Sequence, residues 1–338
     1  MYRFIQFKPG AAMHISRLIV TAILLTAMLS GCKPSTQPEK INLCQGGIIT
    51  PLTLLAQEKG YYAKEGLELA FHPLGDGKLA MEAFLSGKCD AAIVAEPPIV
   101  SRAFTGNPDF SIIATVSSSD NATRIVADRR RGIASVGDLK GKRIGVRKGN
   151  ITHFFLDMYL KANAIRSDQV TFIYLEPAQL SEALTAGKID AYVASDIYLT
   201  EGTRRLGEHA IVLSEPGLCF NSSCLIVRNS MLKEKPDTAR KMLRALLRAE
   251  ARASRNPEEV TQFVAKRREL SEQSASAIIK QQRLAVTLPQ HLLLTLDDHA
   301  TWMQEQGMVP TGKRPEFLKL INETALKELS PGSVSIQR

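Results

Sequence analysis

Residues 82–95 read "EAFLSGKCDAAIVA", and residues 182–195 read "EALTAGKIDAYVAS". Glu, Ala, Gly, Lys, Asp and Ala recur in the same order and at the same spacing. In each copy, apolar residues at helical spacing precede a glycine, which commonly ends a helix. A short apolar run follows the Asp, as in a parallel strand that is buried on both faces. Each copy therefore predicts a helix that leads into a central parallel strand.

The segments that flank the two copies predict the same order of elements. Strand-like segments lie at 41–45, 67–74, 142–147 and 169–175, and helical patterns lie at 52–66 and 152–163. Each unit is thus β-α-β-α-β, which predicts two doubly wound α/β lobes. Residues 236–329 have a helical pattern that is interrupted at Pro and Gly, so we expect a helical C-terminal third.

Two stretches between the units combine strand-like runs with polar turns and are expected to cross between the lobes. We predict that lobe one comprises residues 41–118 and 226–338 and that lobe two comprises residues 125–213. The hinge crossovers then lie near 115–128 and 213–228. Two lobes joined by such a two-segment hinge enclose a cleft that can open and close.

The first 40 residues predict export. The apolar run at 18–29 is too short to span a bilayer but suits a signal peptide. It ends in "LSGC" (29–32), which resembles the lipobox of bacterial lipoproteins, whose Cys is lipidated and becomes the new N-terminus. We predict a signal peptide at 1–31, a lipidated Cys32 and a polar tether at 32–40. A plain signal peptide and an N-terminal membrane anchor remain alternatives, and the protein starts at Met1 or Met13.

Charge and cysteine content narrow the class of protein. The net charge is +9, and residues 1–31 carry three of the 43 basic residues and no acidic one, so cleavage leaves +6. This mild excess of positive charge is compatible with an anionic membrane surface or an anionic ligand, but it does not establish either. The predicted export argues against a nucleic-acid partner. Outside the cytoplasm the remaining cysteines can pair. Cys219 and Cys224 flank the turn-like "FNSS", so we predict a disulfide between them and leave the state of Cys44 and Cys89 open.

Four arginines recur at intervals of four residues in the C-terminal third: Arg240, Arg244, Arg248 and Arg252. They share one face of a predicted helix, opposite Leu243, Leu246 and Leu247. Such a row is usually the solvated side of an amphipathic helix. Contact with lipid headgroups or with a permease is the alternative.

Several stretches resemble the periplasmic solute-binding proteins of ABC importers, in the group that includes nitrate, sulfonate, taurine and thiamine-pyrimidine-precursor proteins. They are "AQEKGYYAKEGLEL" (56–69), "GKCDAAIVAEPPIV" (87–100), "VGDLKGKRIGVRKGNITHFFLDMYLKAN" (136–163) and "LEPAQLSEALTAGKIDAYVASD" (175–196). The resemblance covers most of residues 41–200. It implies a small-molecule ligand, a permease and ATPase as partners, a monomer, and no cofactor or metal. Members often carry aromatic-Glu-Pro where this chain has Ser195-Asp196-Ile197.

Ligands of open parallel sheets bind beyond the carboxyl ends of the strands, where helix N-termini offer free backbone N–H groups. On this basis the candidate ligand contacts are Gly46, Thr50, Gly77, Glu96, Asn150, Thr152, His153 and Asp196, and for His153 the family resemblance adds support. Ser118 and Arg124 are further candidates, because they lie at the crossover, where donors can reach either lobe. The glycines alternatively serve plain turns, the acids face solvent, Arg124 pairs with a hinge carboxylate, and His153 caps its helix or packs in the core.

The function predicted is a lipid-anchored binding component of an ABC importer, on the periplasmic side or the outer face of the cell membrane. It would capture a small organic solute, such as a sulfonate, a nitrogen heterocycle or an amine, rather than catalyse a reaction. An enzyme of the thiamine-precursor type on the same fold, or a sensor subunit, is the alternative. The catalytic motifs G-x-S-x-G, H-E-x-x-H, P-loop and G-x-G-x-x-G are absent from the sequence.

Overall fold

The two copies of the repeated segment adopt the same structure in the computed structural model, which describes Met1 and residues 37–46, 50–106 and 108–337. The first copy forms α4 (Gly77–Leu85) and β3 (Ala91–Val94), and the second forms α7 (Pro177–Thr185) and β8 (Ala191–Ser195). Each helix is followed by a glycine with positive φ, 84° at Gly87 and 71° at Gly187, a conformation that strains other residues. The predicted helix and strand are confirmed in both copies.

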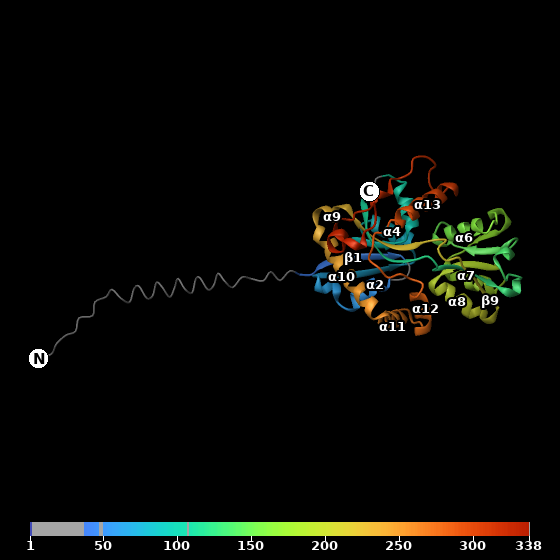
Figure 1. Cartoon of the computed structure of the whole chain (residues 1–338), viewed down its shortest axis with the longest axis horizontal. Helices are drawn as coiled ribbons and strands as arrows, with labels where there is room; N and C mark the ends of the chain where they lie inside the picture. Colours follow the sequence, from blue (N-terminus) through green and yellow to red (C-terminus); the bar gives the residue numbers. More distant parts are fainter. Residues whose placement is uncertain (2–36, 47–49, 107, 338) are drawn as a thin grey trace. The chain divides into compact units, whose positions relative to one another are not determined.

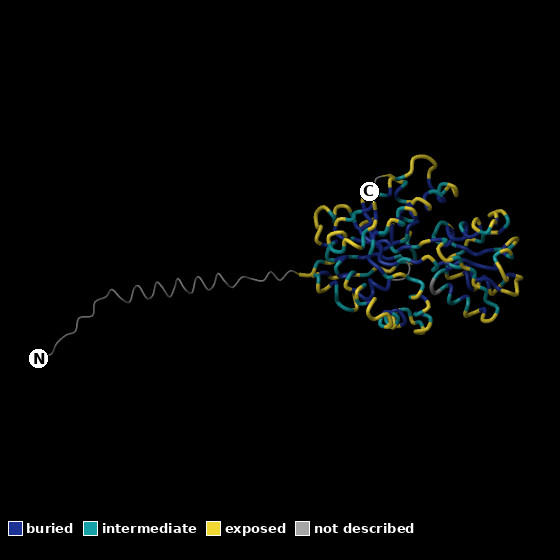
Figure 2. The backbone as a smooth tube through the Cα atoms, in the orientation of Figure 1, coloured by how far each residue is buried: buried dark blue, intermediate teal, exposed yellow. Residues whose placement is uncertain are grey.

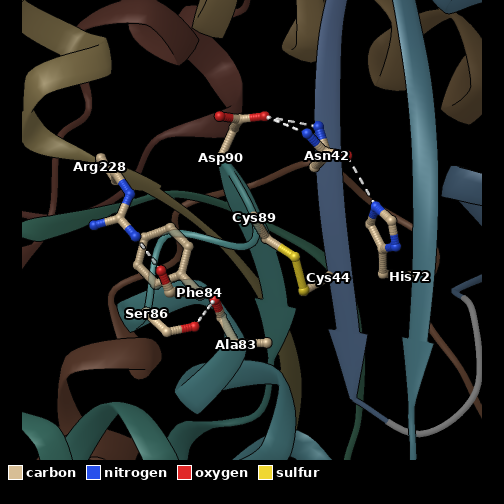
Figure 3. Close-up of a disulfide and its surroundings, with 9 residues drawn as sticks. All are labelled: Asn42, Cys44, His72, Ala83, Phe84, Ser86, Cys89, Asp90 and Arg228. Atoms are coloured by element: carbon tan, nitrogen blue, oxygen red, sulfur yellow. Dashed lines mark hydrogen bonds between the residues drawn. A yellow bond between two sulfur atoms is a disulfide. The ribbon is translucent and has the colours of Figure 1, made fainter.

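The repeated aspartate has the same structural task in both lobes. Asp90 Oδ2 accepts a hydrogen bond from the backbone N–H of Asn42 at 2.8 Å, and Asp190 Oδ2 accepts one from the N–H of Arg143 at 2.9 Å. Asn42 belongs to β1 (Glu39–Gly46) and Arg143 to β6 (Arg143–Val146). Each aspartate thus fastens a central strand to its parallel neighbour, and Figure 3 shows this for Asp90. The sequence repeat therefore serves strand pairing.

Lobe one contains a five-stranded sheet in the order β2-β1-β3-β10-β4. Its further strands are β2 (Leu67–Leu74), β4 (Phe110–Ser119) and β10 (Asn221–Arg228), and its first helices are α2 (Pro51–Glu58), α3 (Tyr61–Lys64) and α5 (Glu96–Ala103). β1 is parallel to β2 and β3, whereas β10 runs antiparallel between β3 and β4. The sheet is therefore mixed.

Lobe two repeats this plan in the order β7-β6-β8-β5-β9. Its elements are β5 (Thr123–Asp128), α6 (Ile151–Ala162), β7 (Thr171–Tyr174), α8 (Asp196–Leu206) and β9 (Ala210–Leu213), together with β6, α7 and β8. β6 is parallel to β7 and β8, and β5 is antiparallel to β8. Figure 1 shows this lobe in green, with α6, α7, α8 and β9 beside one another.

The chain passes between the lobes twice. Residues 120–122 lead from β4 to β5, and residues 214–220 lead from β9 back to β10. The remaining helices follow β10: α9 (Asn229–Glu234), α10 (Pro236–Arg255), α11 (Pro257–Arg268), α12 (Glu272–Ile279), α13 (His291–Glu305) and α14 (Thr324–Leu329). α10 packs against α2 and α3, and α13 packs against α5, so the helical C-terminal third completes lobe one.

One apolar core runs through lobe one and continues into lobe two. It includes Phe84 and Phe110 of lobe one and Phe155 and Leu156 of α6. A second cluster, with Leu184 and Tyr192, belongs to lobe two alone. Figure 2 shows buried residues along the strands of each lobe and exposed residues on the outer helices. The two lobes are therefore joined by side-chain packing as well as by the hinge segments.

The predicted Cys219–Cys224 disulfide is wrong, because both residues are buried free cysteines. Cys224 lies inside β10, and an extended strand rises about 3.3 Å per residue, which separates the two cysteines by more than the usual Cα–Cα limit of about 7 Å. The disulfide instead joins Cys44 of β1 to Cys89, just before β3, with the Cα atoms 5.7 Å apart. Figure 3 shows it between the neighbouring strands.

The arginine row of α10 pairs within the protein. Arg240 contacts Glu328 at 2.7 Å, Arg244 and Arg248 both contact Glu65 at 2.7 and 2.9 Å, and Arg252 contacts Glu259 at 2.5 Å. Glu65 lies at the end of α3, Glu259 in α11 and Glu328 in α14. The row therefore fastens α10 to three neighbouring elements, a role that neither sequence-based interpretation included.

The predicted signal peptide, apart from Met1, and Cys32 lie outside the described residues. The predicted tether at 32–40 overlaps the first strand, which begins at Glu39. Within the part of the chain that the structure describes, every helix is too short or too polar to cross a membrane.

Candidate ligand-binding cleft

A cavity of about 510 Å³ lies between the lobes, a size typical of small-molecule sites. The ends of β1, β3 and β8, the N-termini of α4, α6 and α7, and part of β10 form its walls. We call this cavity the inner chamber. Gly46, Gly77, Asn150 and Thr152, four of the predicted contacts, line it. The topological rule that ligands bind beyond strand ends therefore selected residues at the edge of each sheet that lines this cavity.

Two helix N-termini face this chamber from opposite lobes. Asp76 caps α4 by accepting a hydrogen bond from the N–H of Leu79 at 2.8 Å. Asn150 caps α6, and its Oδ1 accepts from the N–H groups of Thr152 and His153 at 3.0 and 3.2 Å. The N-terminus of a helix carries a partial positive charge, which favours anionic or hydrogen-bond-accepting ligand groups.

Gly46 allows a close backbone approach at the floor of the chamber. A Cβ atom on Gly46 would lie 2.6 Å from the backbone carbonyl carbon of Asp76, closer than atoms can pack. The last residue of β1 must therefore be glycine if α4 is to begin at this place. Sequence reasoning had given a plain turn and a ligand contact equal weight, and the structure shows a packing reason for the glycine.

Arg147 lines the inner chamber and was missed from the sequence. It lies directly after β6 and forms ion pairs with Asp76 of lobe one and, at 3.0 Å, with Glu176 of lobe two. Its side chain is 24% exposed and that of Asp76 is 19% exposed, so solvent screens the pair only in part. The positional rule that selected Glu96 after β3 applies equally to Arg147 after β6.

A smaller pocket of about 80 Å³ continues the inner chamber toward the hinge. It shares Ser195, Asn221 and Ser223 with the chamber and adds Thr50 and Ser118, both predicted contacts. Hydroxyl groups from β4, β8 and β10 thus meet where the chain crosses between the lobes. We call this space the hinge pocket.

Arg124, another predicted contact, lies apart from both of these spaces. Arg124 lines a separate pocket of about 30 Å³ with residues of α8 and α12. Asp196 is the first residue of α8, and its side chain lies outside the described residues.

Glu96 is fully buried and faces the protein interior. Its Oε1 accepts a hydrogen bond from the backbone N–H of Ser222 in β10 at 2.9 Å. Burial raises the pKa of Glu96 to about 7, because removal from water disfavours the charged form; hydrogen bonds from the backbone and Ser222 oppose this effect. The preceding Ala95 lines the chamber instead, since the chain turns inward as α5 begins.

His153 also lies inside the protein, with 1% of its surface exposed. Its ring packs edge-to-face against Phe172, Tyr174 and Trp302, with centroids 5.7, 5.6 and 5.2 Å away. Nδ1 accepts a hydrogen bond from the N–H of Gly149 at 3.2 Å. Burial lowers the pKa of His153, and the charge of Asp157 opposes this effect. This placement matches the core-packing alternative for His153.

The chain is similar in sequence to one described family and to several proteins that are named for binding. The sequence pattern described as NMT1/THI5 like matches residues 49–260. A Brucella abortus protein named as a binding protein is 29% identical over 226 residues, which cover 64% of this chain and 67% of that protein. A Bacillus subtilis protein named as an aliphatic sulfonates-binding protein is 25% identical over 241 residues, covering 68% and 72%.

The fold is also known from solved structures. The alkanesulfonate-binding protein SsuA from Xanthomonas axonopodis pv. citri, bound to MOPS, superposes with a TM-score of 0.73 at 19% identity, covering 85% of this chain and 99% of that one. The prediction of two α/β lobes in the manner of periplasmic binding proteins is therefore confirmed.

Proposed function

The chain belongs to the NMT1/THI5-like family, and from this membership we propose that it is the extracytoplasmic solute-binding component of an ABC importer. It captures a small organic solute between its lobes and delivers it, as a monomer, to a permease and its ATPase. The observation that carries the proposal is the inner chamber, to which both lobes contribute helix N-termini and strand ends. A ligand held there is enclosed when the lobes close.

The charges in the cleft suit a solute that carries polar groups at defined places. Arg147 can hold an acidic group, and Asp76 and Glu176 can hold an amine or a protonated ring nitrogen. The name of the Bacillus subtilis relative supports a sulfonate. We propose a sulfonate, a nitrogen heterocycle or an amine as the class of solute.

A thermal-shift screen of sulfonates, nitrogen heterocycles, amines and inorganic oxyanions tests this function. A ligand present at 100 times its dissociation constant should stabilise the protein by about 2.7 kcal/mol. Calorimetry on each hit should then give one site per chain. Binding at multiple weak sites, or no stabilisation by any class, would contradict the proposal.

We further propose that the mature protein begins at a lipidated Cys32. The apolar run that ends in "LSGC" before a polar tether supports this. Intact-mass analysis of protein extracted from membranes should show a diacylglyceryl-modified N-terminal cysteine. A mature form cut elsewhere, or a Cys32→Ser variant that is still anchored, would refute the lipid anchor and leave the binding function untouched.

An enzyme of the thiamine-precursor type is the alternative, because the sequence resembles that group as well. Among the described residues that line the inner chamber there is no cysteine or histidine to act as nucleophile or general base. Following a bound solute by NMR distinguishes the two functions: a binding protein returns it unchanged. A sensor subunit would bind the same solute without stimulating uptake by a permease.

A further inference from the structure

A second pocket, of about 500 Å³, lies outside the cleft at the C-terminal end of α6. Seven of its eight lining residues lie between Asp157 and Ser167 of lobe two, and the eighth is Gln306, which follows α13 of lobe one. None of these described residues also lines the inner chamber or the hinge pocket. The helix rises about 14 Å from Thr152, which lines the inner chamber, to Lys161, which lines this pocket. We call this separate space the rear pocket.

The carboxylate of Asp157 lines the rear pocket from the inside, since only 4% of this side chain is exposed. Its Oδ2 accepts two hydrogen bonds from lobe one, from Trp302 at 2.6 Å and from Gln306 at 3.1 Å. Among the described residues, no donor reaches Oδ1 within hydrogen-bond distance. This second oxygen can therefore accept a hydrogen bond from a solute in the pocket.

The charge of Asp157 is not balanced by a neighbouring side chain. In the described part of the chain, the one basic group within 4.0 Å of this carboxylate is His153, whose Nε2 lies 3.9 Å from Oδ2. Burial lowers the pKa of His153, so its ring is neutral near pH 7. Buried carboxylates are normally paired with a cation. The rear pocket is therefore suited to a solute that brings a cationic group to Asp157.

Two basic side chains, Lys161 and Arg166, lie at the rim of the rear pocket. Lys161 pairs with Glu305 at 2.8 Å and Arg166 with Asp168 at 3.0 Å, and the two basic side chains are 58% and 72% exposed. Exposed ion pairs of this kind are weak, so both side chains can turn to an acidic group of a solute. The other lining residues, apart from Asp157, are uncharged. A plain cation would meet like charge at the rim, whereas a zwitterion matches both the inner wall and the rim.

We propose that the rear pocket is a second solute site, which binds a small amino acid with its ammonium group on Asp157 and its carboxylate beside Lys161 and Arg166. The inference goes beyond the proposed function, because this site is separate from the cleft. Gln306 of lobe one lines the pocket and donates to the same carboxylate. A bound amino acid thus touches both lobes and favours the arrangement in which they meet at Asp157.

Calorimetry with glycine, β-alanine, 4-aminobutyrate and 6-aminohexanoate tests the class of solute, because this series places the two charges at different separations. At least one of the four should bind. The compounds n-butylamine and butyrate each lack one of the charges and should bind at least about tenfold more weakly than the best amino acid, since each loses a charge-assisted contact. No binding by any of the four, or equally tight binding of n-butylamine, would overturn the inference.

Two matched variants locate the site. Asp157→Asn removes the charge but keeps an oxygen that can accept from Trp302 and Gln306, and it should weaken the best amino acid by about tenfold to hundredfold. Asp76→Asn makes the same change in the inner chamber, where asparagine still caps α4, and should leave the affinity unchanged. The double variant Lys161→Gln/Arg166→Gln alters only exposed positions and should weaken binding by about threefold to tenfold.

The outcomes separate this inference from the proposed function. If Asp76→Asn loses affinity for the amino acid while Asp157→Asn keeps it, the amino acid binds in the cleft, and the rear-pocket site is wrong. Unchanged affinity in the double variant contradicts the assigned carboxylate end, and this variant decides alone if Asp157→Asn does not fold. Failure of every solute to bind in the cleft would count against the proposed function and leave the rear-pocket site in place.

Discussion

The indole Nε1 of Trp302 donates a hydrogen bond to Oδ2 of Asp157 at 2.6 Å, and both side chains are buried. Trp302 lies in α13 of lobe one and Asp157 in α6 of lobe two. Gln306 donates to the same oxygen at 3.1 Å, and Phe154 of α6 packs against Trp302 and His299. This contact therefore connects the lobes in addition to the two hinge segments and the Arg147–Asp76 ion pair, and a relative motion of the lobes must pivot near it or break it.

Trp302→Phe should loosen this connection. It removes a hydrogen bond to a charged group and leaves a space beside α6, which should lower the free energy of unfolding by roughly 2–4 kcal/mol. Small-angle scattering of ligand-free protein should show a larger radius of gyration. Phe110→Leu, a change confined to the core of lobe one, is the control: it should reduce stability without expanding the protein. Equal radii in both variants would show that the contact does not hold the lobes together.

His153→Ala should act on stability rather than directly on the ligand. The ring fills a space between three aromatic side chains, so its removal should lower the free energy of unfolding by about 2–4 kcal/mol. Urea titration of ligand-free protein measures this loss. The opposite result, unchanged stability with binding weakened by tenfold or more, would return His153 to the ligand site as the sequence suggested.

Glu96 should make stability depend on pH in a direction unusual for an acid. Because its pKa is about 7 in the folded protein and about 4.3 in an unfolded chain, the folded state holds the proton more tightly. Its contribution to stability is therefore present at low pH and is lost as pH rises through this window, by about 4 kcal/mol in total.

The comparison of Glu96→Gln with wild type isolates this effect. Buried His299, whose pKa is lowered to about 3, and His153 change stability with pH in the opposite sense, so the wild-type curve alone does not suffice. Relative to wild type, the variant should gain about 3 kcal/mol between pH 4 and pH 8. Urea titrations at several pH values measure this gain, and parallel curves for the two proteins would contradict it.

The Cys44–Cys89 disulfide should stabilise lobe one. It closes a loop with a sequence separation of 45, for which loop-closure entropy gives about 4 kcal/mol. Reduction of the wild type should therefore lower the free energy of unfolding by roughly 2–4 kcal/mol. The Cys44→Ala/Cys89→Ala variant should be equally weakened and insensitive to reductant, whereas Cys219→Ala/Cys224→Ala should respond to reductant as the wild type does. Peptide mapping that finds Cys44 and Cys89 as free thiols would refute the pairing.

The sequence predicted the lobes well because their signals are local. Helical spacing, a glycine with positive φ and a short apolar run define α4–β3 and α7–β8 without knowledge of the rest of the chain. The prediction of the disulfide was wrong because the correct pairing joins segments that are distant in the sequence. Cys219 and Cys224 are near in sequence but separated by an extended strand, whereas β1 and β3 bring Cys44 to Cys89 across 45 residues.

Sequence reasoning selected residues at the edge of each sheet that lines the inner chamber, but it did not establish which side chains face the chamber. Which side chains face the cleft depends on where each helix begins: Ala95 lines the chamber, but Glu96 turns inward. Arg147 follows β6 as Glu96 follows β3, so the rule that selects polar residues after a central strand could have selected Arg147 as well. Its pairing with Asp76 depends on the angle between the lobes, which no local pattern encodes.

The position of β10 has a consequence for the order of folding. This strand lies in the middle of the sheet of lobe one, between β3 and β4, yet it is synthesised only after all of lobe two. Lobe two, which is continuous in sequence, can form as soon as its residues emerge, whereas lobe one must keep a gap in its sheet until residues 221–228 arrive. Contacts between such distant segments form slowly. A chain that crosses a membrane from its N-terminus would therefore remain incompletely folded until nearly two-thirds of it had been translocated, which suits export in an unfolded state.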